Sequence, residues 1–552
     1  MTQTMSPARP LSAALAGQRS LDLALAAALV VLGAALAYLL VGGIPLIGID
    51  DAAITRSYSE NVASGAGYVY NVGGERVEGS TTFLWMLLLT LVYSLTATPE
   101  PIILLLCALL SFTAVYSALR LAHRLAIWFD LDPTVIRAGL AAILLAIPGY
   151  FLWTVWTMME VALWSAALLA FLVLLSDLAE GEDGRVTAPG ILILATLLPL
   201  IRPEGIAVSA GLLALALILR LYAWRLIGAA LALSVAAFVA LTLFRISYFG
   251  QPFPNTFYAK VSSDTLQGLK DGLKYLFDFV LSGLLIEAFV VAWAGAAVFA
   301  LLRLRAPGAK ALLLASATIF GTLAIYAALG GDHFVLWRFY QPIGPLLPVA
   351  FVLALAAAIR VRMAWWSVGA AAAALMVLGW VQYYQARFDI LKEYALVERG
   401  LGFGTYLNTF EPRPSIGVGP AGGIALAYDG QIYDLLGLNW TVMAHANPVK
   451  EGMRNHASFD KPTFWAHQPD VLSAFNRACT RNANGTGQAF WSTDDAAFDG
   501  LFTDPDFRAA YIPVRFTSGD ECWPGFAQPD WLETAEGPGL ERLEWDTVEI
   551  RQ

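Results

Sequence analysis

Two adjacent carboxylates, Asp50 and Asp51, directly follow the first long apolar run of the chain. A carboxylate at the edge of a membrane is costly to place there, so a pair of them predicts a functional role. An aspartate can accept a proton or stabilise a positively charged reacting centre. Because neighbouring helical residues point about 100° apart, we expect one aspartate to face that centre and the other to anchor the loop. The alternative is that both cap the following helix, where Asp is favoured.

Four basic or titratable residues near the ends of later apolar runs are candidates for binding an anionic group: Arg202, Lys260, His333 and Arg338. A phosphate is the anion that suits them, because one guanidinium can contact two phosphate oxygens at once. For Arg202 the alternative is a structural ion pair with Glu204, two positions further on.

The composition indicates that membrane helices hold these side chains in place. Of the 552 residues, 58% are hydrophobic and only 14% are charged. A soluble protein could not bury that much apolar surface, so we predict an α-helical polytopic membrane protein with the lipid bilayer as a partner. The net charge of −9 and the dispersed basic residues exclude nucleic acid as a partner.

Cysteine and histidine are too sparse for a metal-binding framework. The chain has 3 cysteines and 5 histidines, and no pair of histidines has the spacing of a zinc site. We therefore predict no metal ligands and no certain cofactor, although a divalent cation beside Asp50 and Asp51 stays possible. Cys479 and Cys522 can be joined by a disulfide or remain free thiols.

The long apolar runs predict the membrane spans. They fall at 21–43, 101–124, 135–150, 158–178, 188–201, 204–220, 226–248, 281–304, 310–329, 341–359 and 364–384. The first is too long for a signal peptide and is expected to be an uncleaved helix. A further run, 81–97, is short, and counting it as a span would put the basic residues between 120 and 124 outside. The positive-inside rule thus favours about eleven spans with 81–97 lying along the outer interface.

An odd number of spans places the last part of the chain outside the cytoplasm. We predict a membrane domain over 1–384, whose first outer loop, 44–100, carries juxtamembrane helices. Residues 385–552 are richer in Gly, Pro, Asn and Asp and predict a soluble α/β domain, with strands near 415–418 and 511–516.

The first outer loop resembles a known superfamily. The motifs that carry the resemblance are Asp50-Asp51, Gly65-x-Gly67-x-Val69-x-Asn71 and Glu75-x-Val77-Glu78-Gly79. They resemble the GT-C superfamily of polyprenyl-phosphate-sugar-dependent glycosyltransferases, and within it most of all the terminal arabinofuranosyltransferase (AftB-like) family. The family's usual Tyr-Thr-Asn after Glu-Gly is replaced by Ser80-Thr81-Thr82, which puts the sugar in question.

The resemblance implies a function and a location. The chain would transfer a sugar, arabinofuranose by the subgroup, from a polyprenyl-phosphate donor to a cell-envelope glycan or lipid-linked acceptor. Asp50 and Asp51 would be the catalytic acid/base pair, and Arg202, Lys260, His333 and Arg338 would bind the donor phosphate. The chain would lie in a bacterial inner (plasma) membrane, crossing it many times, with its C-terminal domain in the periplasm.

Four further residues are candidates for binding the acceptor or a sugar: Glu160, Trp156, Trp337 and Tyr58. Glu160 can orient an acceptor hydroxyl or cap its helix. The tryptophans can stack on a sugar or belong to the aromatic belt of the membrane interface.

Two other classes of protein compete with this interpretation. One is a transporter or flippase of lipid-linked sugars, although the chain shows no internal symmetry of the kind common in transporters. The other is a non-catalytic envelope-assembly protein whose outer domain binds sugar. Replacing Asp50 and Asp51 by Asn separates an enzyme from both.

Overall fold

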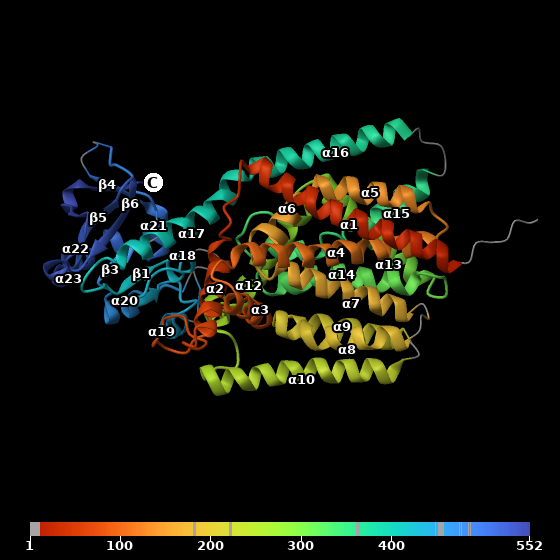
Figure 1. Ribbon diagram of the computed structural model, residues 1–552, viewed down its shortest axis with the longest axis horizontal. Helices are drawn as coiled ribbons and strands as arrows, with labels where there is room; N and C mark the ends of the chain where they lie inside the picture. The colour runs from red at the N-terminus through yellow and green to blue at the C-terminus, as the bar shows by residue number, and fades with distance from the viewer. Residues whose placement is uncertain are drawn as a thin grey trace, which may run out of the picture.

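The computed structural model describes residues 11–551 except 180, 182–183, 220–222, 360–364, 448, 451–457, 474, 476, 484 and 486. Most of the chain is helical, and a smaller sheet-containing part follows at the C-terminal end (Figure 1).

The helices that coincide with the predicted spans pack side by side in a bundle (Figure 1). They are α1 (Leu11–Val41), α4 (Glu100–Trp128), α5 (Pro133–Ala146), α7 (Val161–Ala179), α8 (Gly184–Ile201), α9 (Gly205–Ile218), α10 (Trp224–Phe249), α13 (Leu284–Leu302), α14 (Ala309–Ala328), α15 (Val349–Ile359) and α16 (Trp365–Gln385). Each overlaps one of the apolar runs. Within the described chain 6 helices are long and apolar enough to cross a membrane by themselves, or 7 if the bent pair Pro133–Ala146 and Gly149–Trp156 forms one span. The predicted class, an α-helical polytopic membrane protein, is confirmed.

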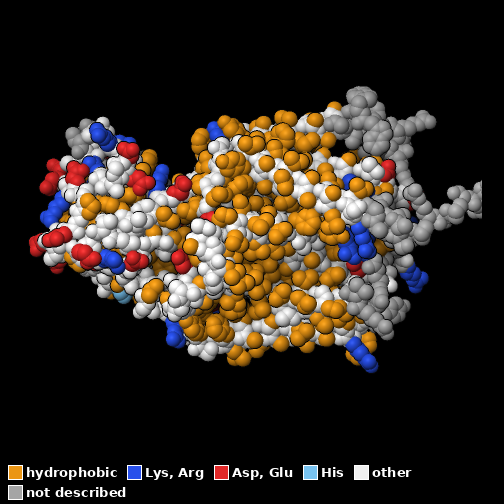
Figure 2. Space-filling model, in the orientation of Figure 1, with side chains coloured by type: hydrophobic (Ala, Val, Ile, Leu, Met, Phe, Trp, Pro, Cys, Tyr) orange, Lys and Arg blue, Asp and Glu red, His pale blue; other side chains and the backbone are white. Residues whose placement is uncertain are grey.

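The outside of the bundle is apolar. Exposed leucines, valines and phenylalanines cover its flank, while charged side chains gather on the C-terminal domain and at the opposite end (Figure 2). Exposed apolar surface of this extent would be unstable in water, and it matches the hydrocarbon core of a bilayer.

Short helices collect at the end of the bundle next to the C-terminal domain (Figure 1). They are α2 (Asp50–Ala63), α3 (Phe83–Leu95), α11 (Asn255–Lys260) and α12 (Thr265–Val280). The run 81–97 therefore forms a helix of only 13 residues, too short to cross a bilayer of ordinary thickness. Arg56 of α2 donates to Tyr93 of α3 at 3.0 Å and pairs with Glu100 at the start of α4, which fixes α2 against the bundle.

The C-terminal domain begins with α17 (Arg387–Leu407) and is built on a mixed sheet of 6 strands in the order β2-β1-β3-β6-β5-β7. The strands are β1 (Ile416–Val418), β2 (Ile432–Asp434), β3 (Val471–Ser473), β5 (Ile512–Ser518), β6 (Glu521–Ala527) and β7 (Leu540–Arg542). β1 is parallel to β2 and β3, whereas β3, β6, β5 and β7 pair antiparallel in turn. The two strands expected from the sequence are β1 and β5.

Two smaller features complete this domain. β4 (Gln488–Trp491) and β8 (Val548–Arg551) pair in parallel as a separate sheet. Cys479 and Cys522 are joined by a disulfide, which decides between the two states left open by the sequence.

Candidate active site

The two neighbouring aspartates sit in the first turn of α2 and do not cap it. The residue before them, Ile49, occupies the N-cap position in an extended conformation, and no side chain caps this helix end. The carboxylates are thus free to make contacts outside their own helix, and they point to different partners.

Asp51 faces a cluster of cations. Its Oδ2 accepts a hydrogen bond from Arg338 Nη1 at 2.8 Å, and the Lys260 ammonium lies 4.0 Å from the same oxygen. Burial raises the pKa of Asp51, but the nearby charges of Lys260 and Arg338 outweigh burial and hold this pKa well below its ordinary value. Asp51 is therefore ionised throughout the physiological pH range.

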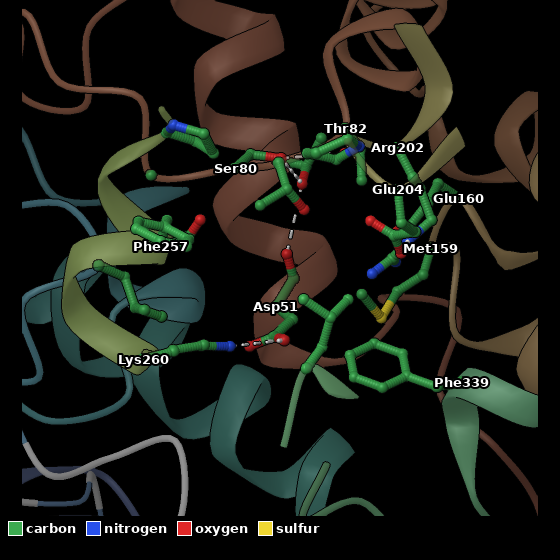
Figure 3. A pocket seen from close by; sticks show the side chains of 18 of the residues that line it. Asp51, Ser80, Thr82, Met159, Glu160, Arg202, Glu204, Phe257, Lys260 and Phe339 are labelled. Carbon is green, nitrogen blue, oxygen red and sulfur yellow. Dashed lines mark hydrogen bonds and ion pairs between the residues drawn. The ribbon is translucent and has the colours of Figure 1, made fainter. Parts of the chain in front are cut away.

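Asp51 lies at the wall of a cavity of about 200 Å³. Figure 3 shows Lys260 and Phe257 on one side of this cavity and Glu160, Arg202 and Glu204 on the other, with Asp51 between them. The remaining wall is largely apolar. Its members include Phe253, Pro254, Val261, Leu329 and Phe339.

The tight turn from α8 to α9 carries a third cation of the cavity, Arg202. Gly205 permits this turn, because a Cβ there would lie 2.1 Å from the carbonyl oxygen of Leu198. The Arg202 guanidinium is paired with Glu160 and Glu204. The ion pair with Glu204 that the sequence offered as an alternative is therefore present, and Arg202 still lines the cavity.

Asp50 points away from the cavity toward the C-terminal domain. Its carboxylate accepts hydrogen bonds from the backbone N–H groups of Gly422 at 3.0 Å and Gly423 at 2.9 Å. These glycines begin the short helix α18 (Gly422–Ala425), and a Cβ at Gly422 would lie 2.0 Å from the carbonyl oxygen of Asp50. Burial raises the pKa of Asp50 to about 6 despite these hydrogen bonds. The two aspartates thus differ in contacts and in acidity.

Further hydrogen bonds join the first outer loop and α11 to the C-terminal domain. Tyr70 donates to the carbonyl oxygen of Ala421 at 2.5 Å. Asn71 exchanges two hydrogen bonds with the backbone of Ile432, and Asn255 donates to the carbonyl of Gly437 at 2.8 Å. The domain is therefore docked on the loop that presents Asp51.

Two of the predicted sugar-binding residues lie outside the cavity. Tyr58 is fully buried, accepts from Gly79 N–H at 2.9 Å and donates to Asn439 at 3.1 Å, so it supports the loop from behind. The indole of Trp156 donates to the carbonyl of Ala34 at 2.9 Å and packs on Tyr38 of α1. Neither ring lines the space that Asp51 faces.

Two more predicted residues line a second hollow rather than the first cavity. His333 and Trp337 belong to it, together with Asp332. Arg338 separates the two spaces, because its Nε donates to Asp332 Oδ2 at 2.6 Å while Nη1 donates to Asp51. Of the ten residues named from the sequence, the first cavity gathers Asp51, Glu160, Arg202, Lys260 and Arg338.

Asp332 and a chain of hydroxyl groups were missed from the sequence. Asp332 has no exposed side-chain surface and holds Arg338, and its place in the Gly330-Gly331-Asp332-His333 turn was a usable signal. Thr55, Ser80 and Thr82 are linked by hydrogen bonds of 2.9 and 3.0 Å and line the cavity. Ser80 and Thr82 are labelled in Figure 3. They provide neutral donors and acceptors beside Asp51.

Among the residues that the structure describes, no group of three or more His, Cys, Asp or Glu side chains is arranged to hold a metal ion. The cations that face Asp51 are Arg338 and Lys260, both supplied by the chain.

The fold is shared with solved structures of a membrane protein. No protein-family model matches the chain, and no curated protein sequence matches it significantly. The crystal structure of ArnT from Cupriavidus metallidurans bound to undecaprenyl phosphate superposes with a TM-score of 0.51 at 14% sequence identity, covering 81% of this chain and 92% of ArnT. The apo structure of the same protein also gives a TM-score of 0.51 at 14% identity, over 83% and 93%. This likeness shows that the chain has the GT-C fold.

Proposed function

We propose that this protein is a membrane glycosyltransferase that takes a sugar from a polyprenyl-phosphate donor and adds it to a cell-envelope glycan or a lipid-linked acceptor. The observation that carries the proposal is the position of Asp51, an ionised carboxylate in a cavity with Arg202, Lys260 and Arg338. The shared fold supports it, since the similar structure of ArnT holds undecaprenyl phosphate. The motifs of the first outer loop resemble those of the terminal arabinofuranosyltransferases, so arabinofuranose is the proposed sugar.

The cavity supplies what such a transfer needs. The acceptor hydroxyl oxygen attacks the anomeric carbon, its proton passes to the Asp51 carboxylate, and the bond from that carbon to the phosphate oxygen breaks with its electron pair leaving on the phosphate. Lys260 and Arg338, with Arg202 across the cavity, neutralise the departing phosphate. The apolar residues Phe253, Phe257 and Val261 provide a surface for the first isoprene units.

Donor binding would also activate Asp51. Without the donor, Lys260 and Arg338 keep the pKa of this carboxyl low, which makes it a weak base. A phosphate that shares these two cations reduces their hold on Asp51 and raises its pKa. The base is then strengthened when the donor is in place.

The disulfide supports an extracytoplasmic position for the C-terminal domain. Disulfides such as Cys479–Cys522 form and persist in oxidising compartments. The C-terminal domain and α2, which carries Asp51 of the cavity, lie at the same end of the bundle (Figure 1), so we propose that the reaction takes place on the outer side of a bacterial plasma membrane.

Deletion of the gene, followed by mass spectrometry of the envelope glycans and of the polyprenyl-phosphate lipids, tests the proposal. We expect one sugar to be missing from the glycan and the matching polyprenyl-phosphate sugar to accumulate. The intact chain should reverse both changes, and the Asp51→Asn variant should reverse neither. An unchanged glycan, or restoration by Asp51→Asn, would overturn the proposed activity.

A further inference from the structure

A second hollow of about 690 Å³ lies beside the first cavity, on the other side of Arg338. It is formed by α12, by the loop before Arg338 and by the end of α16. Its volume is within the range of pockets that bind small organic ligands. The proposed transfer step does not use it.

The lining of this hollow differs in charge from the first cavity. The ammonium of Lys274 is paired with Asp278 at 2.9 Å, and His333 lies 3.5 Å from Asp332. Each positive or titratable group therefore has an acidic neighbour, and Lys274 is the only lysine or arginine among the described residues that line this hollow. The cations of the first cavity also have acidic neighbours, but three of them, Arg202, Lys260 and Arg338, line that one space. A neutral ligand fits this second lining better than an anion.

Aromatic and amide side chains line the hollow and indicate which kind of neutral ligand it can bind. Trp337, Phe334 and Tyr275 contribute rings, and Gln382 and Gln385 contribute amides at the end of α16. A sugar ring has an apolar face of C–H groups that packs on an aromatic ring, and its hydroxyls hydrogen-bond to amides.

The loop that carries Trp337 has an unusual backbone. Leu336 and Trp337 both have positive φ values, 60° and 51°, which are costly for side chains of this size. Such conformations are often kept at ligand-binding sites, where the surrounding structure enforces them. The ring of Trp337 meets Phe279 edge-on, with ring centroids 5.8 Å apart.

We propose that this second hollow binds a neutral sugar ring of the acceptor glycan, with Trp337 as the stacking surface and Gln382 and Gln385 as hydrogen-bonding groups. Arg338 connects this hollow to the first cavity, because it contacts Asp332, which belongs to the hollow, and Asp51, which lines the cavity. A glycan held there has its next residue within reach of the reacting centre. Its role as acceptor rests on the proposed function, whereas the binding of sugar does not.

The test uses the full chain in lipid nanodiscs and a panel of neutral probes: methyl α-D-arabinofuranoside, methyl α-D-mannopyranoside and methyl β-D-glucopyranoside. Saturation-transfer NMR measures their binding, and we expect at least one Kd of about 1–10 mM, typical of a single sugar ring. Trp337→Leu and Gln385→Ala should each weaken that binding about tenfold or more. Trp337→Phe, which keeps a ring, and Gln267→Ala, an exposed amide of α12 outside the hollow, should bind as the intact chain does.

Undecaprenyl phosphate serves as the second probe and as a folding control. Its affinity should be unchanged in Trp337→Leu and Gln385→Ala, because the hollow does not contain the cation cluster. If Trp337→Leu loses undecaprenyl phosphate as well, Gln385→Ala decides the matter. Sugar binding that is absent from the intact chain, or equal in the intact chain and Gln385→Ala, overturns the proposal. Failure of the proposed function is distinguishable, because the intact chain would then bind the glycosides without transferring any sugar.

Discussion

Asp50 accepts a backbone hydrogen bond of 2.9 Å from Gly423, a residue 373 positions further along the chain. This contact ties the first turn of α2, which also carries Asp51, to the C-terminal domain. We therefore expect the domain to position Asp51 in the cavity. A substitution that disturbs this contact should shift Asp51, although no residue that lines the cavity is replaced.

Gly422→Ala tests this positioning role. A Cβ at Gly422 would lie 2.0 Å from the carbonyl oxygen of Asp50, so α18 must move away from α2. We expect a loss of about 1–3 kcal/mol of stability, as for an overpacked core, together with slower sugar transfer. Thermal unfolding and a transfer assay measure the two effects. Gly268→Ala is the control because open space surrounds that position, and equal behaviour of the two variants would argue against the positioning role.

The acidity of Asp50 predicts a dependence of stability on pH. Burial raises its pKa from 3.8 to about 6, so the folded protein binds this proton more tightly than the unfolded chain does. The resulting stabilisation is fully present below pH 3.8 and is lost as the pH rises through about 6, with a size of about 3 kcal/mol.

This effect is measured as the free energy of unfolding of the intact chain and of the Asp50→Asn variant at pH values from about 4 to about 7, which cover the range between the unfolded and folded pKa of Asp50. Asp50→Asn should show a shallower slope, since its side chain does not titrate. A residual slope is expected, because burial raises the pKa of Asp434 to about 6 and that of Glu393 to about 7. An identical slope in both proteins would contradict the assignment.

Arg338→Gln should destabilise the protein strongly. It leaves the carboxylate of Asp332, which has no exposed side-chain surface, without its arginine partner. Losing one side of a buried ion pair costs about 3–5 kcal/mol. The double variant Arg338→Gln/Asp332→Asn should regain most of this stability, yet it should still bind undecaprenyl phosphate weakly because the cation is missing. A single variant as stable as the intact chain would show that Asp332 does not depend on Arg338.

The disulfide between Cys479 and Cys522 should stabilise the C-terminal domain. It closes a loop with a sequence separation of 43, for which chain-entropy arguments give about 2–4 kcal/mol. Cys479→Ser/Cys522→Ser should therefore lower the unfolding temperature of the domain. Mass spectrometry of alkylated protein taken from membranes should find Cys479 and Cys522 blocked and Cys107 available only after denaturation. Reactive thiols at both positions would place the domain in a reducing compartment.

The sequence predicted the membrane fold and the three cations of the cavity, because Arg202, Lys260 and Arg338 all lie near ends of apolar runs that the positive-inside rule assigns to one side. It also predicted that the two aspartates would point in different directions, and they do have different partners. The partner of Asp50 was not predictable, since a contact with Gly423 depends on how a distant domain docks.

The direction of individual side chains was the other feature that the sequence could not predict. Tyr58 occupies the same helix as Asp51, but its face of α2 packs against Gly79 and Asn439 instead of the cavity. Trp337 precedes Arg338 directly and yet lines a different space, because a positive φ at Trp337 turns the chain between them. Residue type and spacing do not predict the direction of either side chain.

The rate of sugar transfer by Asp51→Asn tests the central claim most directly. The full chain is reconstituted with a membrane lipid extract that supplies polyprenyl-phosphate sugars and with envelope glycan as acceptor, and the released polyprenyl phosphate is quantified. We expect Asp51→Asn to lower kcat by about 10²–10⁴-fold, the usual contribution of a general base. Asp389→Asn, the same change at an exposed acidic residue of α17, should match the intact chain. Transfer by Asp51→Asn at the rate of Asp389→Asn would contradict the account.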